Sequence, residues 1–482
     1  MHRDASYPPT IFVILGITGD LAQKKLIPAL LDLYVRGKLP LRFRIVGFSR
    51  REFSHEDFRS FLNQAITEKA HHHNQRMVQE FLNTIFYHQG LFDDEAHYVH
   101  LAEMLQHIDK EFGQCSNKLF YLAVPPAHYE VIFKNLAHSK LTVPCSEEAG
   151  WTRILVEKPF GNDVDTAVKL DRMLGKLFRE EQIFRIDHYL AKETVQNILS
   201  FRFSNTIFEP LWNHRYIGEV HIQFLEKHDL SKRGAFYDPI GALRDVGQNH
   251  LLQMLSLIAM ENPRTLTASD IRSERARVLE RLSLSKKFRK YHRRAQYEGY
   301  RDEANVLSGS ETETYFRLAL GVRNSRWRGV PFFLESGKAL NESSVSITIH
   351  FKALPKLHFF SQEERECRNT LTFMIQPKPG IKVSFWAKKP GFDNLLQEKP
   401  LSFFYAESDN DERIPDAYER VLFDCIRGDQ TLFASTEEVI ASWKFITPIL
   451  KRWKKTPLYR YARGADPQTI GEEINEKSRD LF

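Results

Sequence analysis

Short apolar runs alternate with helical stretches through the first third of the chain, and this alternation limits the possible folds more than any other feature. Thr10–Leu15 is apolar and rich in β-branched residues, as a buried strand is. The other predicted strands here are Arg42–Phe48, Lys118–Val124, Arg153–Glu157 and Gln182–Ile186. The predicted helices are Leu21–Arg36, with a kink at Pro28, Ala127–Leu136 and Asp165–Leu177. Apolar strands separated by helices predict a parallel sheet covered on both faces.

The pattern changes after Asp187, where longer strand-like runs replace the alternation. In several of these runs polar and apolar residues alternate, which is typical of antiparallel strands. The predicted strands are Glu219–Leu225, Tyr315–Val322, Ser344–Phe351, Thr370–Gln376 and Lys382–Phe385. We therefore predict an α/β, Rossmann-like doubly wound domain over residues 1–187. We expect an α+β domain with a large, mostly antiparallel sheet over residues 188–482.

The composition is ordinary for a globular protein. Of 482 residues, 42% are hydrophobic and 27% are charged, and the net charge is +6. No apolar run approaches the ~20 residues that span a bilayer, so we expect no membrane segment. The apolar stretch Ile11–Ile17 is short for a signal peptide, and we interpret it as a buried strand of a protein that stays where it is made. The mild positive charge favours an anionic small ligand and is too dilute to indicate nucleic acid.

Three other polar features have plain structural interpretations. The four cysteines, Cys115, Cys145, Cys367 and Cys425, are widely spaced and form no Cys-x-x-Cys pair, which favours reduced thiols in a cytoplasmic protein. His71–His73 is interpreted as a loop or helix surface rather than a metal site. The basic run Ser283–Arg294 is interpreted as a solvated surface segment, with a phosphate contact or a subunit contact as the alternative.

A glycine turn joins the first predicted strand to the first predicted helix. Gly16, Thr18, Gly19, Asp20 and Leu21 lie in this turn. The pyrophosphate of a dinucleotide meets helix amide groups at such a position. The turn lacks the full G-x-G-x-x-G pattern, so a simple tight turn is the alternative. Its place between a strand and a helix favours a dinucleotide site.

The end of the second predicted strand indicates which dinucleotide binds. NAD enzymes usually place an acidic residue there to hold the ribose 2′-hydroxyl. Here Ser49, Arg50 and Arg51 take that place. A guanidinium can bind a 2′-phosphate through paired hydrogen bonds, whereas an acid would repel it. We therefore predict NADP over NAD, with Arg50 as the principal ligand; the alternative is a pair of merely exposed arginines.

Three further stretches give the chain its most specific signal. They are Val156–Gly161, Arg185–Glu193 and Arg244–Gln253. Together with Gly16–Leu21 they resemble the motifs of the glucose-6-phosphate dehydrogenases, and Arg185–Glu193 carries the most specific of these. The resemblance extends to about Pro448 and includes Arg326–Phe332, Gly337–Asn341, Ile375–Pro377 and Pro415–Arg420.

The resemblance implies an activity for the chain. The family oxidises β-D-glucose 6-phosphate to 6-phospho-D-glucono-1,5-lactone with NADP⁺, at the entry to the oxidative pentose phosphate pathway. It also implies that residues 1–187 bind NADP and that residues 188–482 bind substrate. The later domain would form a homodimer or homotetramer through its large sheet. No metal is implied.

Two residues match the family's proton-transfer machinery. The reaction removes a proton from O1 of the sugar, and an imidazole is a suitable base because its ordinary pKa of ~6.5 lies near neutral pH. His250 matches this base, and we expect it early in a helix, where the helix dipole would keep it neutral. Asp187 matches the residue that orients the base. A buried structural histidine and a helix N-cap are the alternatives for these two residues.

The remaining site residues follow from the same resemblance. Substrate ligands are expected at Lys158, His188, Tyr189, Lys192, Glu226, Asp245 and Lys338. Lys158 is also expected to contact the nicotinamide. If a helix begins after Asp187, His188 and Lys192 share one face and present a cationic site to the sugar phosphate; an exposed polar face is the alternative. Glu226 and Asp245 would accept sugar hydroxyls, and surface charge is the alternative for Glu226.

The sequence departs from the family pattern at two positions. Ser343 stands where a second basic phosphate ligand is usual, which predicts a weaker grip on the phosphate or compensation from elsewhere. Glu335 stands where an arginine is usual, and it argues against a second, structural NADP site.

Other functions stay open at this point. One is a hexose-6-phosphate dehydrogenase of broader specificity, or one that accepts NAD. Another is a non-catalytic relative that serves as a regulatory subunit, although the catalytic motif residues argue against it. A third is nucleic-acid binding through Ser283–Arg294, which would need a larger basic surface.

Overall fold

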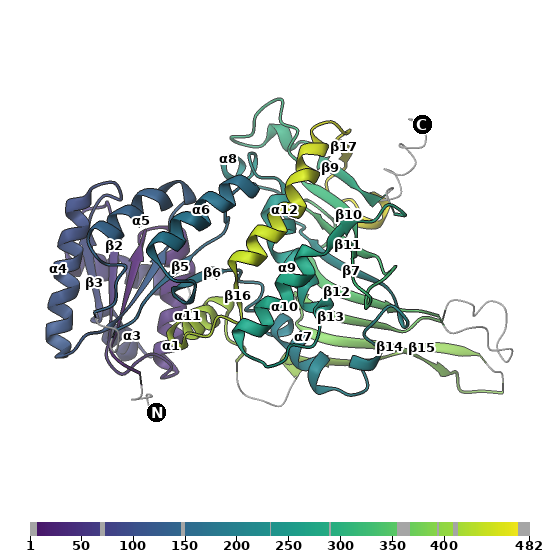
Figure 1. Ribbon diagram of the computed structural model, residues 1–482, viewed down its shortest axis with the longest axis horizontal. Coiled ribbons are helices and arrows are strands. Elements are labelled where there is room, and N and C mark those ends of the chain that lie inside the picture. Colours follow the sequence, from purple (N-terminus) through teal and green to yellow (C-terminus); the bar gives the residue numbers. More distant parts are fainter. Residues whose placement is uncertain are drawn as a thin grey trace. The chain divides into compact units, whose positions relative to one another are not determined.

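A computed structural model describes residues 7–67, 73–145, 150–231, 233–288, 291–353, 367–392, 395–407 and 413–470. The chain forms two compact units (Figure 1). The first contains Met1–Gly161, Asp165–Ala191 and Pro415–Thr436. The second contains Asn162–Val164, Lys192–Ile414 and Glu437–Phe482.

The first unit is built on a sheet whose described strands follow the order β16-β6-β5-β4-β1-β2-β3. Its strands are β1 (Thr10–Leu15), β2 (Phe43–Ser49), β3 (Ile85–Gln89), β4 (Asn117–Leu122), β5 (Thr152–Val156), β6 (Ile183–Ile186) and β16 (Phe433–Ala434). All pair in parallel except β16, which pairs antiparallel with β6. The order 3-2-1-4-5-6 is that of a dinucleotide-binding doubly wound fold, so the fold prediction is confirmed.

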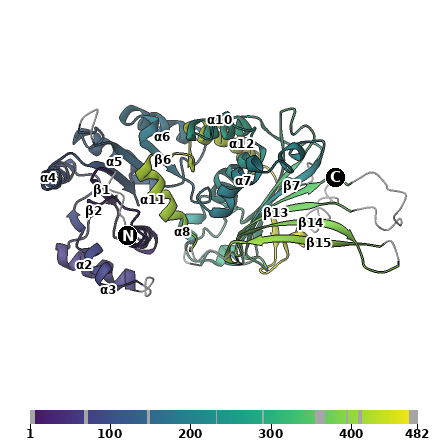
Figure 2. The same cartoon turned by 90° about the horizontal axis from the view of Figure 1, so that it is seen from below.

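Helices cover both faces of this sheet. Figure 2 shows α5 on one side of strands β1 and β2, and α2 on the other. The helical segments of the unit are η1 (Ala22–Leu26), α1 (Ile27–Val35), α2 (His55–Thr67), α3 (Gln75–Leu82), α4 (Glu95–Phe112), η2 (Pro126–His128), α5 (Tyr129–His138), α6 (Val164–Leu177), η3 (Glu180–Gln182) and α11 (Ala417–Arg427). All six residues of β1 are buried, as a strand covered on both faces requires.

The first predicted helix is irregular at the expected place. A π-helical turn, η1, precedes α1, and Pro28 lies in the first turn of α1. Proline cannot donate the backbone hydrogen bond of a regular helix, so the change of helix type stands next to it.

A buried acid in α11 makes the stability of the first unit depend on pH. Burial raises the pKa of Asp424 to about 6, although Nε of Arg420 lies 2.8 Å from its carboxylate. The unfolded chain ionises this group near the ordinary value of ~3.9. The fold therefore loses stability as the pH rises from about 4 through about 6.

Asp424→Asn is expected to remove this loss, because the amide stays neutral. Urea unfolding measured from pH 4 to pH 7 should show the wild type losing on the order of 2 kcal/mol relative to the variant. Parallel stability curves for the two proteins would contradict this interpretation of Asp424.

The second unit is built on a larger sheet. Its path is β15-β14-β13-β12-β7-β11-β10-β9-β17 among the described strands, and β8 pairs with β10. The strands are β7 (Ile217–Leu225), β8 (Leu282–Leu284), β9 (Arg293–Tyr297), β10 (Tyr315–Val322), β11 (Phe332–Gly337), β12 (Ser344–Phe351), β13 (Thr370–Gln376), β14 (Gly380–Lys388), β15 (Leu396–Phe404) and β17 (Tyr459–Tyr461). Only β7 with β11 and β9 with β17 run parallel among these pairs, so the prediction of a mostly antiparallel sheet is confirmed.

Helices pack against one face of this sheet. The helical segments of the unit are α7 (Glu193–Ser204), η4 (Glu209–Leu211), α8 (Gly234–Tyr237), η5 (Leu243–Leu251), α9 (Leu252–Ala259), α10 (Ala268–Glu280), η7 (Tyr300–Asp302), η9 (Tyr405–Glu407) and α12 (Thr436–Trp453). Figure 2 shows α7, α10 and α12 on one side of strands β13 to β15. The apolar residues Val345, Ile347 and Ile349 of β12 are buried, and the alternate residues are partly exposed. No helix among the described residues is long and apolar enough to cross a membrane.

Candidate active site

The glycine turn of the first unit lies at the carboxyl end of β1, as the sequence predicts. Gly16 has φ +84°, and a Cβ there would lie 2.5 Å from the carbonyl oxygen of Ala123. Its amide donates to the carbonyl of Phe48, at 2.8 Å, and the amide of Gly19 donates back to Gly16. The turn therefore needs glycine at position 16, and it leads directly into η1.

The other predicted residues of this turn lie beside the end of β2. Oγ1 of Thr18 is 2.8 Å from Oγ of Ser49, so a hydrogen bond joins the turn to the second strand. Asp20 is exposed and pairs with Lys24, at 2.7 Å. Leu21 immediately precedes η1 and already has helical backbone angles. A backbone turn without side-chain bulk, followed by a helix, fits the pyrophosphate of a dinucleotide.

The end of β2 presents an exposed guanidinium. Ser49 is buried, whereas Arg50 and Arg51 are exposed. The hydroxyl of Tyr87 donates to the carbonyl oxygens of Ser49 and Arg51, so the backbone on both sides of Arg50 is held by a neighbouring strand. This arrangement of a fixed backbone and an accessible cation fits a 2′-phosphate ligand.

A group of tyrosines fixes the peptide that follows β5. Burial raises the pKa of Glu157, and the hydroxyl of Tyr121 donates to its carboxyl group, at 2.5 Å. The hydroxyl of Tyr129 donates to the carbonyl of Glu157, at 3.0 Å. The peptide between Lys158 and Pro159 is cis, and Lys158 is partly exposed. Lys158 therefore extends from a backbone segment that buried groups hold in place.

The turn after β6 corrects one expectation. No helix begins directly after Asp187. Helix α7 begins only at Glu193, and Lys192 is its N-cap residue with extended backbone angles. Oδ1 of the buried Asp187 accepts the amide of Tyr189, at 3.0 Å, which closes a turn instead. The argument that His188 and Lys192 share a helix face is therefore wrong.

Three of the predicted residues still cluster within the first unit. Asp187, His188 and Tyr189 are consecutive, and the rings of His188 and Tyr189 are 4.9 Å apart. The ring of Tyr418, from α11, stacks on His188 with an interplanar angle of 14°. Sequence reasoning gave Tyr418 no role, although it lies within the run Pro415–Arg420.

His250 lies in the second unit on η5, and its position corrects a second expectation. It is the eighth residue of η5, which continues directly into α9, so it does not occupy a helix start. The dipole argument for a neutral imidazole fails, because that effect fades beyond the first turn. The side chain is 1% exposed, and its ring stacks on Phe224 at 6.2 Å. Irregular π-helical segments such as η5 occur frequently at functional sites.

Two charged residues come together where strands β7 and β11 of the larger sheet end. Leu225 and Gly337 pair at the carboxyl ends of the parallel strands β7 and β11. Glu226 and Lys338 are the next residues of the two strands, so the pairing brings them together. Nζ of Lys338 lies 2.5 Å from Oε2 of Glu226.

Tyr237 joins this pair, and sequence reasoning missed it. Nζ of Lys338 lies 5.2 Å from the centre of its ring. Burial raises the pKa of Tyr237, and the charges of Asp245 and Glu226 raise it further. The charge of Glu313 also contributes to this shift, and Lys338, which pairs with Glu226, lies next to the buried phenol. Nothing in the sequence around Tyr237 indicated this.

The two departures from the family pattern have structural roles. Oγ of Ser343 accepts the amide of Lys227, at 2.8 Å. Glu335 is buried in β11 and accepts hydrogen bonds from Gln223 and Tyr315. Neither contact tests the expected effects on phosphate or second-nucleotide binding, and those stay predictions.

The structure can now be compared with the interpretations given to the histidine run, the basic run and the cysteines. His71 and His72 lie outside the described residues, and Nε2 of His73 is 2.7 Å from Asp32. The basic run is not one solvated segment, because it ends in β9, where Arg294 is buried and donates to the carbonyl of Thr456. Arg289 and Lys290 of this run lie outside the described residues. No disulfide joins the four cysteines.

Comparison with known proteins matches nearly the whole chain to one family. Residues 13–197 match the family model "Glucose-6-phosphate dehydrogenase, NAD binding domain", and residues 199–480 match "Glucose-6-phosphate dehydrogenase, C-terminal domain". A Chlamydia pneumoniae protein named glucose-6-phosphate 1-dehydrogenase is 41% identical, over 94% of this chain and 91% of that protein. A Bacillus subtilis protein of the same name is 37% identical, over 95% of each.

Solved structures give the same result. A glucose-6-phosphate dehydrogenase in complex with its substrate glucose 6-phosphate has a TM-score of 0.89 at 34% identity, covering 98% of both chains. A glucose-6-phosphate 1-dehydrogenase from Mycobacterium avium has a TM-score of 0.83 at 32% identity, covering 95% of both chains.

Proposed function

The chain belongs to the glucose-6-phosphate dehydrogenase family, and from this premise we propose how its own residues carry out the family's reaction. The enzyme oxidises D-glucose 6-phosphate at C1 to 6-phospho-D-glucono-1,5-lactone with NADP⁺, the first step of the oxidative pentose phosphate pathway. The observation that carries this assignment is the match of both family domains over nearly the whole chain.

His250 is the proposed base. Oxidation at C1 breaks the O1–H bond and the C1–H bond, and NADP⁺ takes the hydride. A neutral imidazole beside O1 accepts the proton, so negative charge need not build up on O1. The burial of His250 against Phe224 supports this role, because a fixed ring loses little freedom when the substrate binds.

Asp187 is the proposed orienting residue. A carboxylate that accepts a hydrogen bond from the second ring nitrogen of a base fixes its tautomer and stabilises its protonated form. One carboxylate oxygen of Asp187 already accepts a backbone amide, which fixes the orientation of the carboxylate.

The proposed substrate ligands divide by charge. Lys158, His188, Tyr189, Lys192 and Lys338 supply hydrogen-bond donors, and the cations among them attract the phosphate. Glu226 and Asp245 supply acceptors for the sugar hydroxyls. The ion pair of Lys338 with Glu226 supports a shared location for these two ligands.

Lys338→Ala is expected to raise KM for glucose 6-phosphate about 10- to 100-fold, because a charge-assisted hydrogen bond to the phosphate is lost. The change in kcat should be much smaller. Lys382→Ala removes an exposed lysine of β14 and serves as the matched control. Steady-state kinetics on both variants measure these changes. An unchanged KM in Lys338→Ala would show that Lys338 does not bind the phosphate.

The proposed NADP ligands fit the first unit. Gly16, Thr18, Gly19, Asp20 and Leu21 form the turn that would hold the pyrophosphate. Arg50 would hold the 2′-phosphate, and Lys158 would contact the nicotinamide. The fit rests on the turn that excludes a Cβ at Gly16 and on the exposed guanidinium at the adjoining strand end.

We also propose the larger organisation of the enzyme. Residues 1–187 would form the NADP-binding domain, and residues 188–482 the domain for substrate binding and oligomerisation. A homodimer or homotetramer in the cytoplasm is expected, joined through the large sheet, with neither nucleic acid nor membrane as a partner. Sedimentation equilibrium of the purified chain measures the oligomeric state, and a monomer at micromolar concentration would contradict this part.

A further inference from the structure

Three potential metal ligands gather on the larger sheet, outside the residues assigned to the reaction. Glu219 and His350 are directly opposite each other on the antiparallel strands β7 and β12. His221 is two residues after Glu219, so its side chain lies on the same face. A ligand atom of each residue lies within 4.8 Å of the other two.

One pair of these atoms has a spacing close to that of a zinc site. Nε2 of His221 lies 3.5 Å from Oε1 of Glu219. Two ligands of a tetrahedral Zn²⁺ are about 3.3 Å apart, given bond lengths of roughly 2.0–2.1 Å. The rings of His221 and His350 are 5.0 Å apart and inclined by 70°. Small side-chain rotations therefore suffice to bring all three atoms onto one ion.

Nε2 of His221 lacks a hydrogen-bond partner. This atom is buried, and no group in the described part of the chain forms a hydrogen bond to it. A buried imidazole nitrogen without a hydrogen bond is costly, and a metal ion would satisfy it.

The charges around the three ligands partly oppose each other. Glu219 supplies an acidic ligand, whereas the charge of Arg368 acts on Glu219 and His350 and opposes a bound cation. The local charge therefore moderates the affinity of the site.

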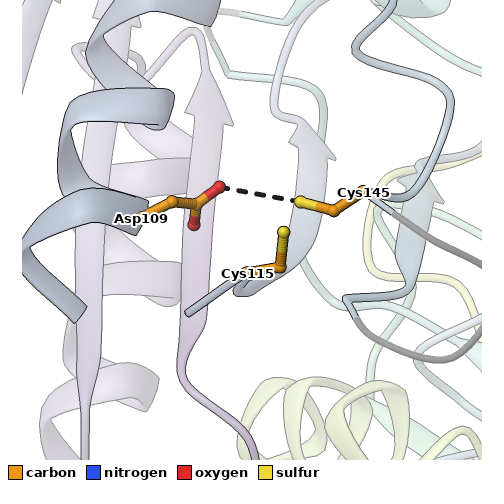
Figure 3. A group of neighbouring side chains, drawn as sticks. All are labelled: Asp109, Cys115 and Cys145. Carbon is orange, nitrogen blue, oxygen red and sulfur yellow. Dashed lines mark hydrogen bonds between the residues drawn. The ribbon is translucent and has the colours of Figure 1, made fainter. Parts of the chain in front are cut away.

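A second group of potential ligands is less suitable. Asp109, Cys115 and Cys145 also lie within 4.8 Å of one another (Figure 3). The ammonium of Lys118 already lies 2.7 Å from Asp109 and 3.6 Å from Cys145. Burial, the largest cause, also raises the pKa of Cys145 to about 11, so the thiol stays protonated. A lysine occupies the place that a metal would need.

We propose that Glu219, His221 and His350 bind a first-row transition-metal dication, with Zn²⁺ as the best match. Two imidazoles and one carboxylate form a ligand set that zinc proteins use, with the fourth position left to water. The ion would tie β7 to β12. The oxidation of glucose 6-phosphate does not use this site, so the two proposals stand or fall separately.

Titration calorimetry of the purified full chain with Zn²⁺ tests the site. The wild type is expected to bind one ion per chain here, and His350→Ala to bind it at least tenfold more weakly, because even a lost outer-shell partner costs about that much. His107→Ala is the matched control. His107 also lies 3.5 Å from a glutamate, Glu111, but no third ligand joins that pair among the described residues. Its loss should leave the affinity unchanged.

Two further measurements keep the result interpretable. Zn²⁺ should raise the melting temperature of the wild type and not that of His350→Ala, since only a ligand of the native state stabilises it. If His350→Ala fails to fold, Glu219→Gln replaces it. A Cys115→Ser/Cys145→Ser double variant should still bind at this site. Equal affinity in the wild type and a folded His350→Ala, or no binding by the wild type, would overturn the proposal.

Discussion

Replacing His250 with Asn is expected to lower kcat by about three orders of magnitude, within the range of 10²–10⁴ that general-base catalysis contributes. The amide of asparagine cannot accept the O1 proton at neutral pH, but it fills much of the same space. The substrate and NADP⁺ should still bind, so KM for both should change little. Steady-state kinetics at saturating substrate measure the effect.

Two controls separate loss of the base from loss of the fold. His292→Asn changes another histidine of the second unit, which bonds to the carbonyl of Ala319, and should keep most of the activity. The acidic limb of the kcat profile should disappear in His250→Asn, because the titrating base is gone. If Asp187 acts only through the base, adding Asp187→Asn to His250→Asn should lower kcat little further. A His250→Asn variant with near-normal kcat would refute the base assignment.

Replacing Arg50 with Ala is expected to weaken NADP⁺ binding about 10- to 100-fold while leaving NAD⁺ binding nearly unchanged. The guanidinium has one proposed role, the 2′-phosphate, and only NADP⁺ carries that group. A hydrogen bond between two charged groups is worth roughly 1.5–3 kcal/mol, which corresponds to this factor. KM for both cofactors at saturating glucose 6-phosphate gives the ratio directly.

The control for this prediction is an exposed arginine elsewhere in the first unit. Arg76, on α3, pairs with Glu80 at the surface, and Arg76→Ala should change neither KM. If Arg50→Ala weakens the binding of NADP⁺ and NAD⁺ equally, Arg50 contacts a part that the two cofactors share. The preference for NADP would then come from another residue.

Strands with clean apolar or alternating patterns were predictable from the sequence. β1, β10, β12 and β13 have the predicted bounds. β15 was missed because most of its residues are exposed and Pro400 interrupts it. β11 was missed because it has no alternation: all six residues, including Glu335, are buried.

The site was predictable only where local sequence carries it. The glycine turn and the end of β2 are local, and the structure places them together through Thr18 and Ser49. The contact of Glu226 with Lys338 depends on the parallel pairing of β7 with β11, which joins residues far apart in the chain. The start of α7 was misplaced because the Asp187 side chain closes a turn where it was expected to cap a helix.

The central claim is that this chain oxidises glucose 6-phosphate with NADP⁺, and one assay tests it most directly. The wild-type protein is mixed with glucose 6-phosphate and NADP⁺, and the appearance of NADPH is followed by its near-ultraviolet absorbance. Parallel reactions contain galactose 6-phosphate, glucose, or NAD⁺. We expect rapid reduction with the first pair and much slower reduction in each of the others. A folded protein that reduces neither cofactor with glucose 6-phosphate would contradict the account.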